Sequence, residues 1–293
     1  GDVYWRLRHT KSDKLITIVE SFHYSDKFKS NYWDKGRVNA VLKDFRRSRK
    51  YATCLYSEPY IPNTNINGLN SILPDVNFAE FERSYNSIQK LHSRDNELII
   101  FQEDKVSKSL VKRNVIYNVD GSGNVATADS VLSQGIPYLG KYGICKNPES
   151  FATYGNRMYL VDVRRGVVLR LSQDGFTLIS ENKMKDYFTD KFEDINDRIN
   201  DNLLHIYGVY DAKFGEYVIS MGKIVIVNPN DNRPETILES ETIGFSEYGK
   251  RWNSFYTYDE LENMCEAMTG FVSFKKGGLW HHNRGGGDNT TIP

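Results

Sequence analysis

A predicted β-hairpin lies in the stretch Asn156-Arg-Met-Tyr-Leu-Val-Asp-Val-Arg-Arg-Gly-Val-Val-Leu-Arg-Leu171. Two apolar runs flank a short turn that contains two arginines and Gly166. Asp162 ends the first run, where its carboxylate can accept hydrogen bonds from the turn backbone, and the glycine tolerates a positive φ. A second turn is predicted at Asp174-Gly175. This order of strand, polar turn and strand is typical of an antiparallel sheet.

Five windows with this pattern together predict the fold class. They are residues 96–111, 156–171, 205–220, 242–256 and 270–281. Hairpins that recur every few tens of residues are typical of a β-propeller, in which each blade is a small antiparallel sheet. A β-sandwich is the alternative, because its strands also recur with turn signals between them. We therefore predict a mainly β, β-propeller-like fold of repeated antiparallel hairpins.

The chain is predicted to divide into two parts. Residues 1–85 contain aromatic residues without a regular period, and an Asn- and Pro-rich stretch at 57–68 leaves little room for regular structure. This part is predicted to be an extended N-terminal arm with short strands at 2–8 and 15–19. Residues 86–293 are predicted to form the β-propeller-like body.

One or two short helices are also predicted. In residues 182–198 the apolar residues recur every three to four positions, which indicates one face of a helix. A second helix is predicted at residues 258–268, with Asp259 as its N-cap before Leu261 and Met264.

Charge and cysteine content exclude several classes of protein. The 293 residues contain 38 Lys and Arg against 38 Asp and Glu, whereas a nucleic-acid-binding protein normally has a basic excess. Cys54, Cys145 and Cys265 lie too far apart for a zinc-type cluster or a dense disulfide framework. No apolar run reaches the length of a membrane span. The chain begins at Gly1 rather than Met, so we expect a piece of a longer protein.

The sequence contains no complete catalytic or metal-binding motif. Neither G-x-S-x-G nor H-E-x-x-H occurs. Gly121-Ser-Gly-Asn124 lacks the Gly-Lys-Ser/Thr of a phosphate loop and is predicted to be a hairpin turn. His281 and His282 are adjacent on a predicted strand, where they point to opposite faces, so one metal ion can rarely take both. We predict no catalytic, cofactor-binding or metal-binding residues.

The paired and clustered charges are interpreted as surface features. Glu103-Asp104 and Glu193-Asp194 have basic neighbours that indicate solvated turns and helix faces. The basic run at residues 43–50 is interpreted as a solvated face or a contact with an acidic partner, because the whole chain is neutral.

Longer motifs run along nearly the whole chain. They are Gly1-Asp-Val-Tyr4, Trp33-Asp-Lys-Gly-Arg-Val-Asn39, Ile61-Pro-Asn-Thr-Asn-Ile-Asn-Gly-Leu-Asn70, Ser87-Ile-Gln-Lys-Leu91, Phe101-Gln-Glu-Asp-Lys-Val106, Asn147-Pro-Glu-Ser-Phe151, residues 154–171, Trp252-Asn-Ser-Phe-Tyr-Thr-Tyr258 and Phe274-Lys-Lys-Gly-Gly-Leu-Trp280. In these motifs the chain resembles virion structural proteins of large tailed bacteriophages, including the crAss-like phages.

The resemblance implies a non-enzymatic virion component of the phage tail, in the nozzle (muzzle) or baseplate, assembled in the bacterial host cytoplasm. Members of this family are similar to one another in forming ring-shaped homo-oligomers, so the expected partners are other copies of the chain and other tail proteins. No cofactor is implied. Buried aromatic anchors dominate such contacts, and the arm offers Phe22, Tyr24, Tyr32 and Trp33 as candidate interface residues.

Two other functions stay open at this point. A receptor- or glycan-binding module of a tail fibre would use exposed Trp and Tyr side chains to stack on sugars. A depolymerase acting on the bacterial surface would need two carboxylates roughly 5 to 9.5 Å apart in one pocket. No local motif indicates such a pair.

Overall fold

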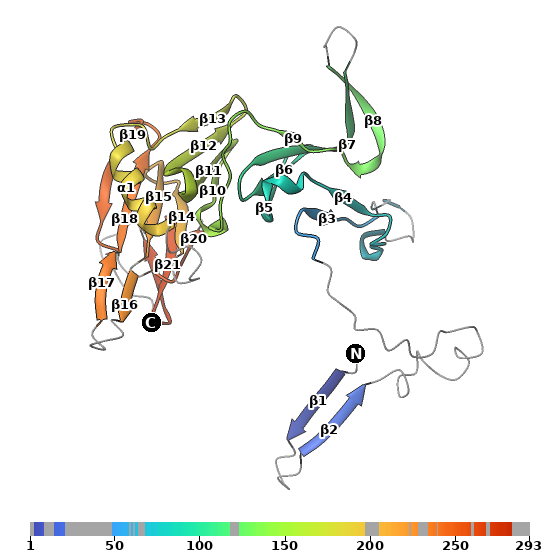
Figure 1. Ribbon diagram of the computed structural model, residues 1–293, viewed down its shortest axis with the longest axis horizontal. Helices are drawn as coiled ribbons and strands as arrows, with labels where there is room; N and C mark the ends of the chain where they lie inside the picture. The colour runs from blue at the N-terminus through green and yellow to red at the C-terminus, as the bar shows by residue number, and fades with distance from the viewer. Residues whose placement is uncertain are drawn as a thin grey trace, which may run out of the picture. The chain divides into compact units, whose positions relative to one another are not determined.

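The computed structural model describes residues 3–8, 15–20, 49–58, 60, 62–63, 68–117, 123–196, 205–222, 224–227, 234–238, 240–258, 261–267 and 270–282. Two compact units can be distinguished, residues 1–49 and residues 50–293. In the first unit, β1 (Val3–Arg8) and β2 (Leu15–Glu20) form an antiparallel pair (Figure 1). The short strands predicted near the N-terminus are therefore confirmed.

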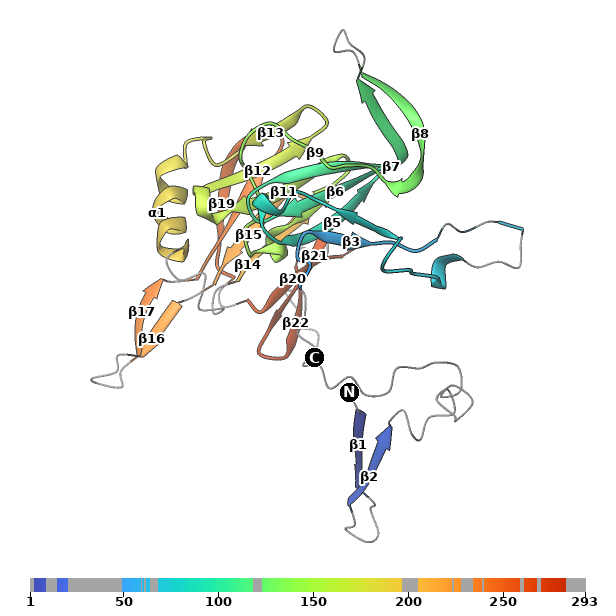
Figure 2. The same ribbon diagram turned by 45° about the vertical axis from the view of Figure 1, so that its right-hand side comes forward.

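The second unit contains successive antiparallel sheets, each built mostly from strands that are consecutive in the chain (Figures 1 and 2). The first sheet consists of β5 (Ile88–Arg94), β6 (Glu97–Gln102), β7 (Val106–Tyr117), β8 (Gly123–Leu132) and β9 (Ile136–Pro137). The second consists of β10 (Ala152–Tyr154), β11 (Arg157–Asp162), β12 (Val167–Ser172) and β13 (Gly175–Leu178). The third consists of β14 (Ile206–Asp211), β15 (Glu216–Met221), β18 (Glu241–Ser246) and β19 (Arg251–Tyr256). The fourth consists of β20 (Asn263–Ala267), β21 (Gly270–Lys275) and β22 (Gly278–His282).

Smaller elements complete the unit. Two two-stranded ribbons are formed by β3 (Thr53–Leu55) with β4 (Phe78–Glu80), and by β16 (Ile224–Val227) with β17 (Pro234–Leu238). The helices are α1 (Lys185–Asn196) and the short 3-10 turns η3 (Gly68–Asn70), η4 (Arg83–Tyr85), η5 (Pro148–Ser150) and η6 (Val163–Arg165). Each of the five predicted windows holds an antiparallel pair of strands, and the fold is mainly β.

Alternation along the strands explains how the sheets stack. On β11, Tyr159 and Val161 point into a core shared with the third sheet, whereas Met158 and Leu160 point into a core shared with the first. All four side chains are buried, because this sheet is covered on both faces. The third sheet likewise shares a further core with the fourth. Neighbouring sheets therefore pack face to face through three apolar cores.

The single α-helix among the described residues packs into the core between the second and third sheets. Phe188, Phe192 and Ile195 are fully buried there. Their spacing of four and three residues places them on one face of the helix, which confirms the helix predicted at 182–198.

The second predicted helix, at residues 258–268, is wrong. This region contains β20, in which Met264 lies opposite Ser273 and Cys265 opposite Val272 of β21. The three-residue spacing of Leu261 and Met264 resembles one face of a helix. Leu261 instead precedes strand β20, and both residues pack into the core between the third and fourth sheets. The strand pairing of β20 with β21 outweighs the helix-like spacing of these residues. Asp259 lies outside the described residues.

Part of the predicted arm lies in the second unit. On the β3–β4 ribbon, Cys54 is buried with Phe81 against Ile100 of β6. The backbone N–H of Ile88 donates to the carbonyl of Tyr51, which ties the ribbon to the first sheet. The scattered aromatic and apolar residues of this region thus include anchors for its own chain.

Candidate functional site: the junctions between sheets

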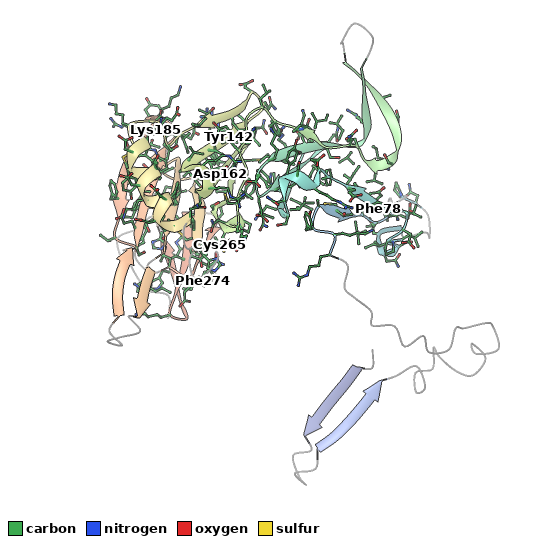
Figure 3. The ribbon with its side chains drawn as sticks, in the orientation of Figure 1. Phe78, Tyr142, Asp162, Lys185, Cys265 and Phe274 are labelled. Atoms are coloured by element: carbon green, nitrogen blue, oxygen red, sulfur yellow. The ribbon has the colours of Figure 1, made fainter. Side chains whose placement is uncertain are left out.

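The first junction is organised around a buried carboxylate, Asp162, at the end of β11 (Figure 3). Its Oδ1 accepts hydrogen bonds from the Cys145 thiol at 3.0 Å and from the Arg165 backbone N–H at 3.3 Å. Its Oδ2 accepts from the Gly143 N–H at 3.0 Å and from Arg165 Nη1 at 2.8 Å. The predicted bond from this aspartate to its own turn is present, and the carboxylate also holds the loop that joins the first two sheets.

Ion pairs extend this junction to the turn between β6 and β7. Asp104 pairs with Arg164 and, at 3.5 Å, with Arg165, while Glu103 lies 3.8 Å from Arg164. The interpretation of Glu103-Asp104 as a solvated turn is therefore wrong, because the two arginines come from the next sheet and half-bury both acids. By contrast, Glu193-Asp194 lies on the exposed face of α1, as predicted.

The electrostatic environment of this junction shifts two pKa values in opposite senses. Burial raises the pKa of Asp104, but hydrogen bonds from Arg164 and Asn86 outweigh burial, so the pKa lies below its usual value. Burial, followed by the nearby Asp162 charge, raises the pKa of the Cys145 thiol to about 12. Cys145 is therefore a hydrogen-bond donor here and a poor nucleophile.

Two glycines allow neighbouring sheets to approach closely. A Cβ on Gly143 would lie 2.1 Å from the carbonyl oxygen of Glu103, and one on Gly208 would lie 2.1 Å from that of Ser150. Both neighbours are backbone atoms, which cannot move aside as a flexible side chain does. Only glycine fits at these two crossing points.

The second junction is organised around Glu247, in the turn between β18 and β19. Its carboxylate accepts hydrogen bonds from Arg157 Nη1 at 3.0 Å, from Arg170 Nη1 at 3.0 and 3.1 Å, and from the Tyr159 hydroxyl at 2.6 Å. All three donors belong to the second sheet, whereas Glu247 follows a strand of the third. This acid therefore joins two sheets across 77 to 90 residues of sequence.

Stacked tyrosines lie beside Glu247. Tyr210 stacks on Tyr154 at 4.3 Å and on Tyr159 at 5.4 Å, and Tyr159 stacks on Tyr217 at 4.9 Å between ring centroids. The Tyr217 hydroxyl donates to the carbonyl of Ser150. Burial, with the hydrogen bond to Glu247, raises the pKa of Tyr159 well above its usual value. The hydroxyls of Tyr159 and Tyr217 stay protonated and donate hydrogen bonds to Glu247 and Ser150.

The third junction is mainly aromatic. The His282 ring stacks on Phe271 at 4.5 Å and lies 4.2 Å from the Tyr258 ring, and its Nε2 forms a 2.7 Å hydrogen bond with Ser273 Oγ. Burial lowers the pKa of His282, so the neutral ring is favoured. The His282 ring thus lies at the end of the last hairpin, packed between the third and fourth sheets.

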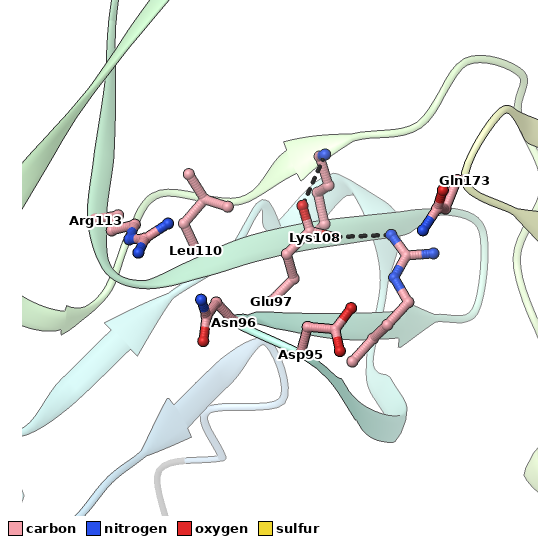
Figure 4. Close-up of a pocket in the computed structure, with 8 residues that line it drawn as sticks. Asp95, Asn96, Glu97, Lys108, Leu110, Arg113 and Gln173 are labelled. Carbon is pink, nitrogen blue, oxygen red and sulfur yellow. Dashed lines mark hydrogen bonds and ion pairs between the residues drawn. The ribbon is translucent and has the colours of Figure 1, made fainter. Parts of the chain in front are cut away.

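A polar cleft of about 350 Å³ lies beside the first sheet (Figure 4). Glu97 crosses it, 2.7 Å from Arg94 and 3.0 Å from Lys108. Burial raises the pKa of Glu97, but hydrogen bonds from these two cations outweigh burial and lower it. A carboxyl held ionised in this way cannot serve as a general acid near neutral pH. The cleft is lined by Arg94, Asp95, Asn96, Glu97, Lys108, Leu110, Arg113 and Gln173.

Phe22, Tyr24, Tyr32 and Trp33 lie outside the described residues, so their role stays a prediction. The same holds for most of the basic run at 43–50 and for Gly121 and Ser122 in the predicted turn, although β7 and β8 pair on either side of that turn. Within the described ranges, no cluster of His, Cys, Asp and Glu side chains could hold a metal ion, and no helix could cross a membrane.

The family model described as Crassvirus muzzle protein matches residues 43–277, which is well over half of the chain. The chain belongs to this muzzle protein family. All three junctions fall almost entirely within the matched segment, so they are features of the muzzle part of the chain rather than of the N-terminal unit. Comparison with curated proteins finds no match. Membership makes the chain a structural protein of a tailed-phage virion, located in the tail.

Proposed function

We propose that this muzzle protein is a non-enzymatic building block that closes into a ring with copies of itself in the tail. The observation that carries the proposal is the use of buried acids between sheets: Asp162 and Glu247 each accept several hydrogen bonds from a neighbouring element. Such acids resist relative movement of the sheets, because each displaced sheet leaves an unpaired buried charge. A rigid body of this kind suits a repeated contact that closes on itself.

We further propose that the four sheets are arranged as propeller-like blades. The support is their connectivity, since most strands pair with their chain neighbours, together with face-to-face packing through three cores. Assembly would take place in the host cytoplasm and would bring the ring into contact with other tail proteins. The N-terminal part of the arm would lie against a neighbour through Phe22, Tyr24, Tyr32 and Trp33.

Electron microscopy of intact particles tests the ring. We expect several copies of the chain, related by rotational symmetry about the tail axis, with the sheets of each copy around a common axis. A chain present as single, unrelated copies would contradict the proposal.

A glycan-binding role is the second candidate, because Tyr248 is fully exposed and Trp280 is 41% exposed. Incubating the purified full chain with host surface polysaccharide separates the three functions. We expect neither binding nor shortening of the polymer. Binding without cleavage would favour the glycan module, and new reducing ends would show an enzyme.

A further inference from the structure

The fourth sheet carries apolar side chains on its outer face as well as on its inner one. Phe271 points into the core shared with the third sheet, so alternation along β21 places Val272 and Phe274 on the opposite face (Figure 3). On that outer face Cys265 lies opposite Val272 in the register. Leu279 likewise lies opposite Phe274. We define Cys265, Val272, Phe274 and Leu279 as the fourth-sheet face.

The composition of the fourth-sheet face is that of a covered face. When one side of an antiparallel sheet is open to solvent, the residues on that side are usually polar. Strand β11, whose sheet is covered on both sides, is apolar on both faces, and β21 follows the β11 pattern. Yet none of the apolar cores formed by the described residues includes the fourth-sheet face. Cys265 is exposed, and the other three residues are only half-buried.

The β3–β4 ribbon presents a second apolar face at the other end of the series of sheets. Cys54 packs against the first sheet, so its neighbour Leu55 lies on the opposite face, where Phe78 is its partner in the register (Figure 3). Leu55 is 56% and Phe78 37% exposed. We define Thr53, Leu55 and Phe78 as the ribbon face. The loop between the two strands adds further exposed apolar side chains, Ile72, Leu73 and Val76. Clustered exposed apolar side chains of this kind mark an interaction site.

Charge does not select the partner of either face. Among the residues that the register places on the outer side of the fourth sheet, none is Asp, Glu, Lys or Arg. At the ribbon face, Lys50 Nζ lies 5.3 Å from the centroid of the Phe78 ring. Glu80, on the same side of the ribbon, pairs with Arg83. Because these charges already have partners within the chain, we expect a contact between the two faces to depend on apolar burial.

We infer that the fourth-sheet face of one copy packs on the ribbon face of the next copy. The inference rests on the proposed ring. Within one copy the ribbon and the four sheets already pack face to face through successive apolar cores, and the two faces lie at the two ends of this series. A second copy would continue the same packing. Two different faces in contact make a head-to-tail interface, which generates a ring when its rotation closes, whereas pairing of like faces would stop at a dimer.

Thiol coupling in intact particles tests this contact, because the fourth-sheet face already carries the exposed thiol of Cys265, whereas Cys54 and Cys145 are buried. Thr53→Cys adds a thiol of similar size to the ribbon face. A short bismaleimide joins two neighbouring thiols, since each thiol adds to one maleimide double bond. In Thr53→Cys particles we expect a ladder of dimers, trimers and larger multimers, because every copy carries one thiol on each face. In wild-type particles we expect monomers only.

Two controls show that the ladder reports this contact. Thr53→Cys with Cys265→Ser should give no multimers. Asp174→Cys, in the exposed turn after β12, keeps Cys265 but should give no ladder. Dimers in the wild type, coupling of Cys265 to a different tail protein, or no ladder in Thr53→Cys would each overturn the inference. If electron microscopy still shows the ring, the proposed function stands in those cases, and if no ring is seen, the proposed function itself fails.

Removal of apolar area from either face should lower incorporation. We expect Phe274→Ser to lower the copies of the chain per particle by about tenfold or more, because aromatic side chains dominate buried contacts. Leu139→Ser, which removes a 94% exposed side chain from the loop after β9, is the matched control and should have no effect. Thermal melting of each purified variant identifies a folding defect. Leu55→Ser, on the ribbon face, is the second variant, with the same expected loss. An unchanged copy number in either variant would overturn the inference.

Discussion

The Asp162 junction and the Glu247 junction both bury a carboxylate against arginines, but the partners come from different distances along the chain. Asp162 receives its bonds from Arg165 in its own turn and from a loop 17 to 19 residues earlier. Glu247 receives its bonds from another sheet, 77 to 90 residues away. The first acid shapes a turn and its loop, whereas the second holds two sheets together. Local and long-range roles can thus be separated by substitution.

Asp162→Asn is expected to have the largest effect. The substitution keeps the shape of the side chain but leaves Arg165 without its buried counter-charge, and losing one partner of a buried pair costs about 3 to 5 kcal/mol. Urea denaturation measures the free energy of unfolding. Asp174→Asn, in the exposed turn after β12, is the control and should change it by less than about 0.5 kcal/mol. A loss below about 1 kcal/mol at Asp162 would mean that the carboxylate does not organise the turn.

Glu247→Gln is expected to have a smaller effect, about 1.5 to 3 kcal/mol, because hydrogen bonds to a charged group are lost but the turn itself remains. Because Glu247 and Arg170 lie on different sheets, we expect the effects of their substitutions on the free energy of unfolding to be non-additive. A double-mutant cycle with Arg170→Gln should give an interaction energy of about 1 to 2 kcal/mol. Glu193→Gln, on the exposed face of α1, is the control. Additive effects of the two single variants would show that Glu247 does not join the sheets.

The Cys145 thiol belongs only to the Asp162 junction and should make stability fall at alkaline pH. Its pKa is raised to about 12 in the folded chain, against about 8.5 for a free thiol. Its contribution is therefore fully present below about pH 8.5 and is lost as the pH rises toward 12, since the unfolded chain releases the proton first. Cys145→Ser should make the decline between pH 9 and 10 shallower by about 1 kcal/mol per pH unit.

The control for this pH dependence is Cys265→Ser, because Cys265 is exposed. Its decline with pH should match that of the wild type. Equal slopes for the Cys145 variant and the wild type would contradict the assignment of this thiol as a buried donor.

Much of the fold could be predicted from local patterns. The hairpin at residues 156–171, with its aspartate and Gly166, appears as β11, η6 and β12, and Gly166 has the expected positive φ of 67°. Helix α1 was predictable because three aromatic and aliphatic side chains share one face. The helix predicted at residues 258–268 failed, because a three-residue spacing within a short strand and its preceding loop imitates a helix face.

The junctions were harder to predict. Nothing near Glu247 in the sequence indicates that it is paired, since its donors lie on another sheet. Glu103-Asp104 were assigned to a solvated turn because Lys105 is adjacent, yet the cations that pair with them are Arg164 and Arg165, about 60 residues later. Ion pairing depends on the distance between two side chains in the folded chain, and a short stretch of sequence does not give that distance.

Backbone preferences and side-chain alternation act over a few residues, so the sequence alone predicted the strands of the five hairpins, their turns and helix α1. The longer motifs were enough to predict the family. Which face of each strand is covered by which sheet, and which buried acid meets which arginine, emerged only when the sheets were stacked. These contacts join residues far apart in the chain, and their energy depends on burial and approach that the packed chain alone provides.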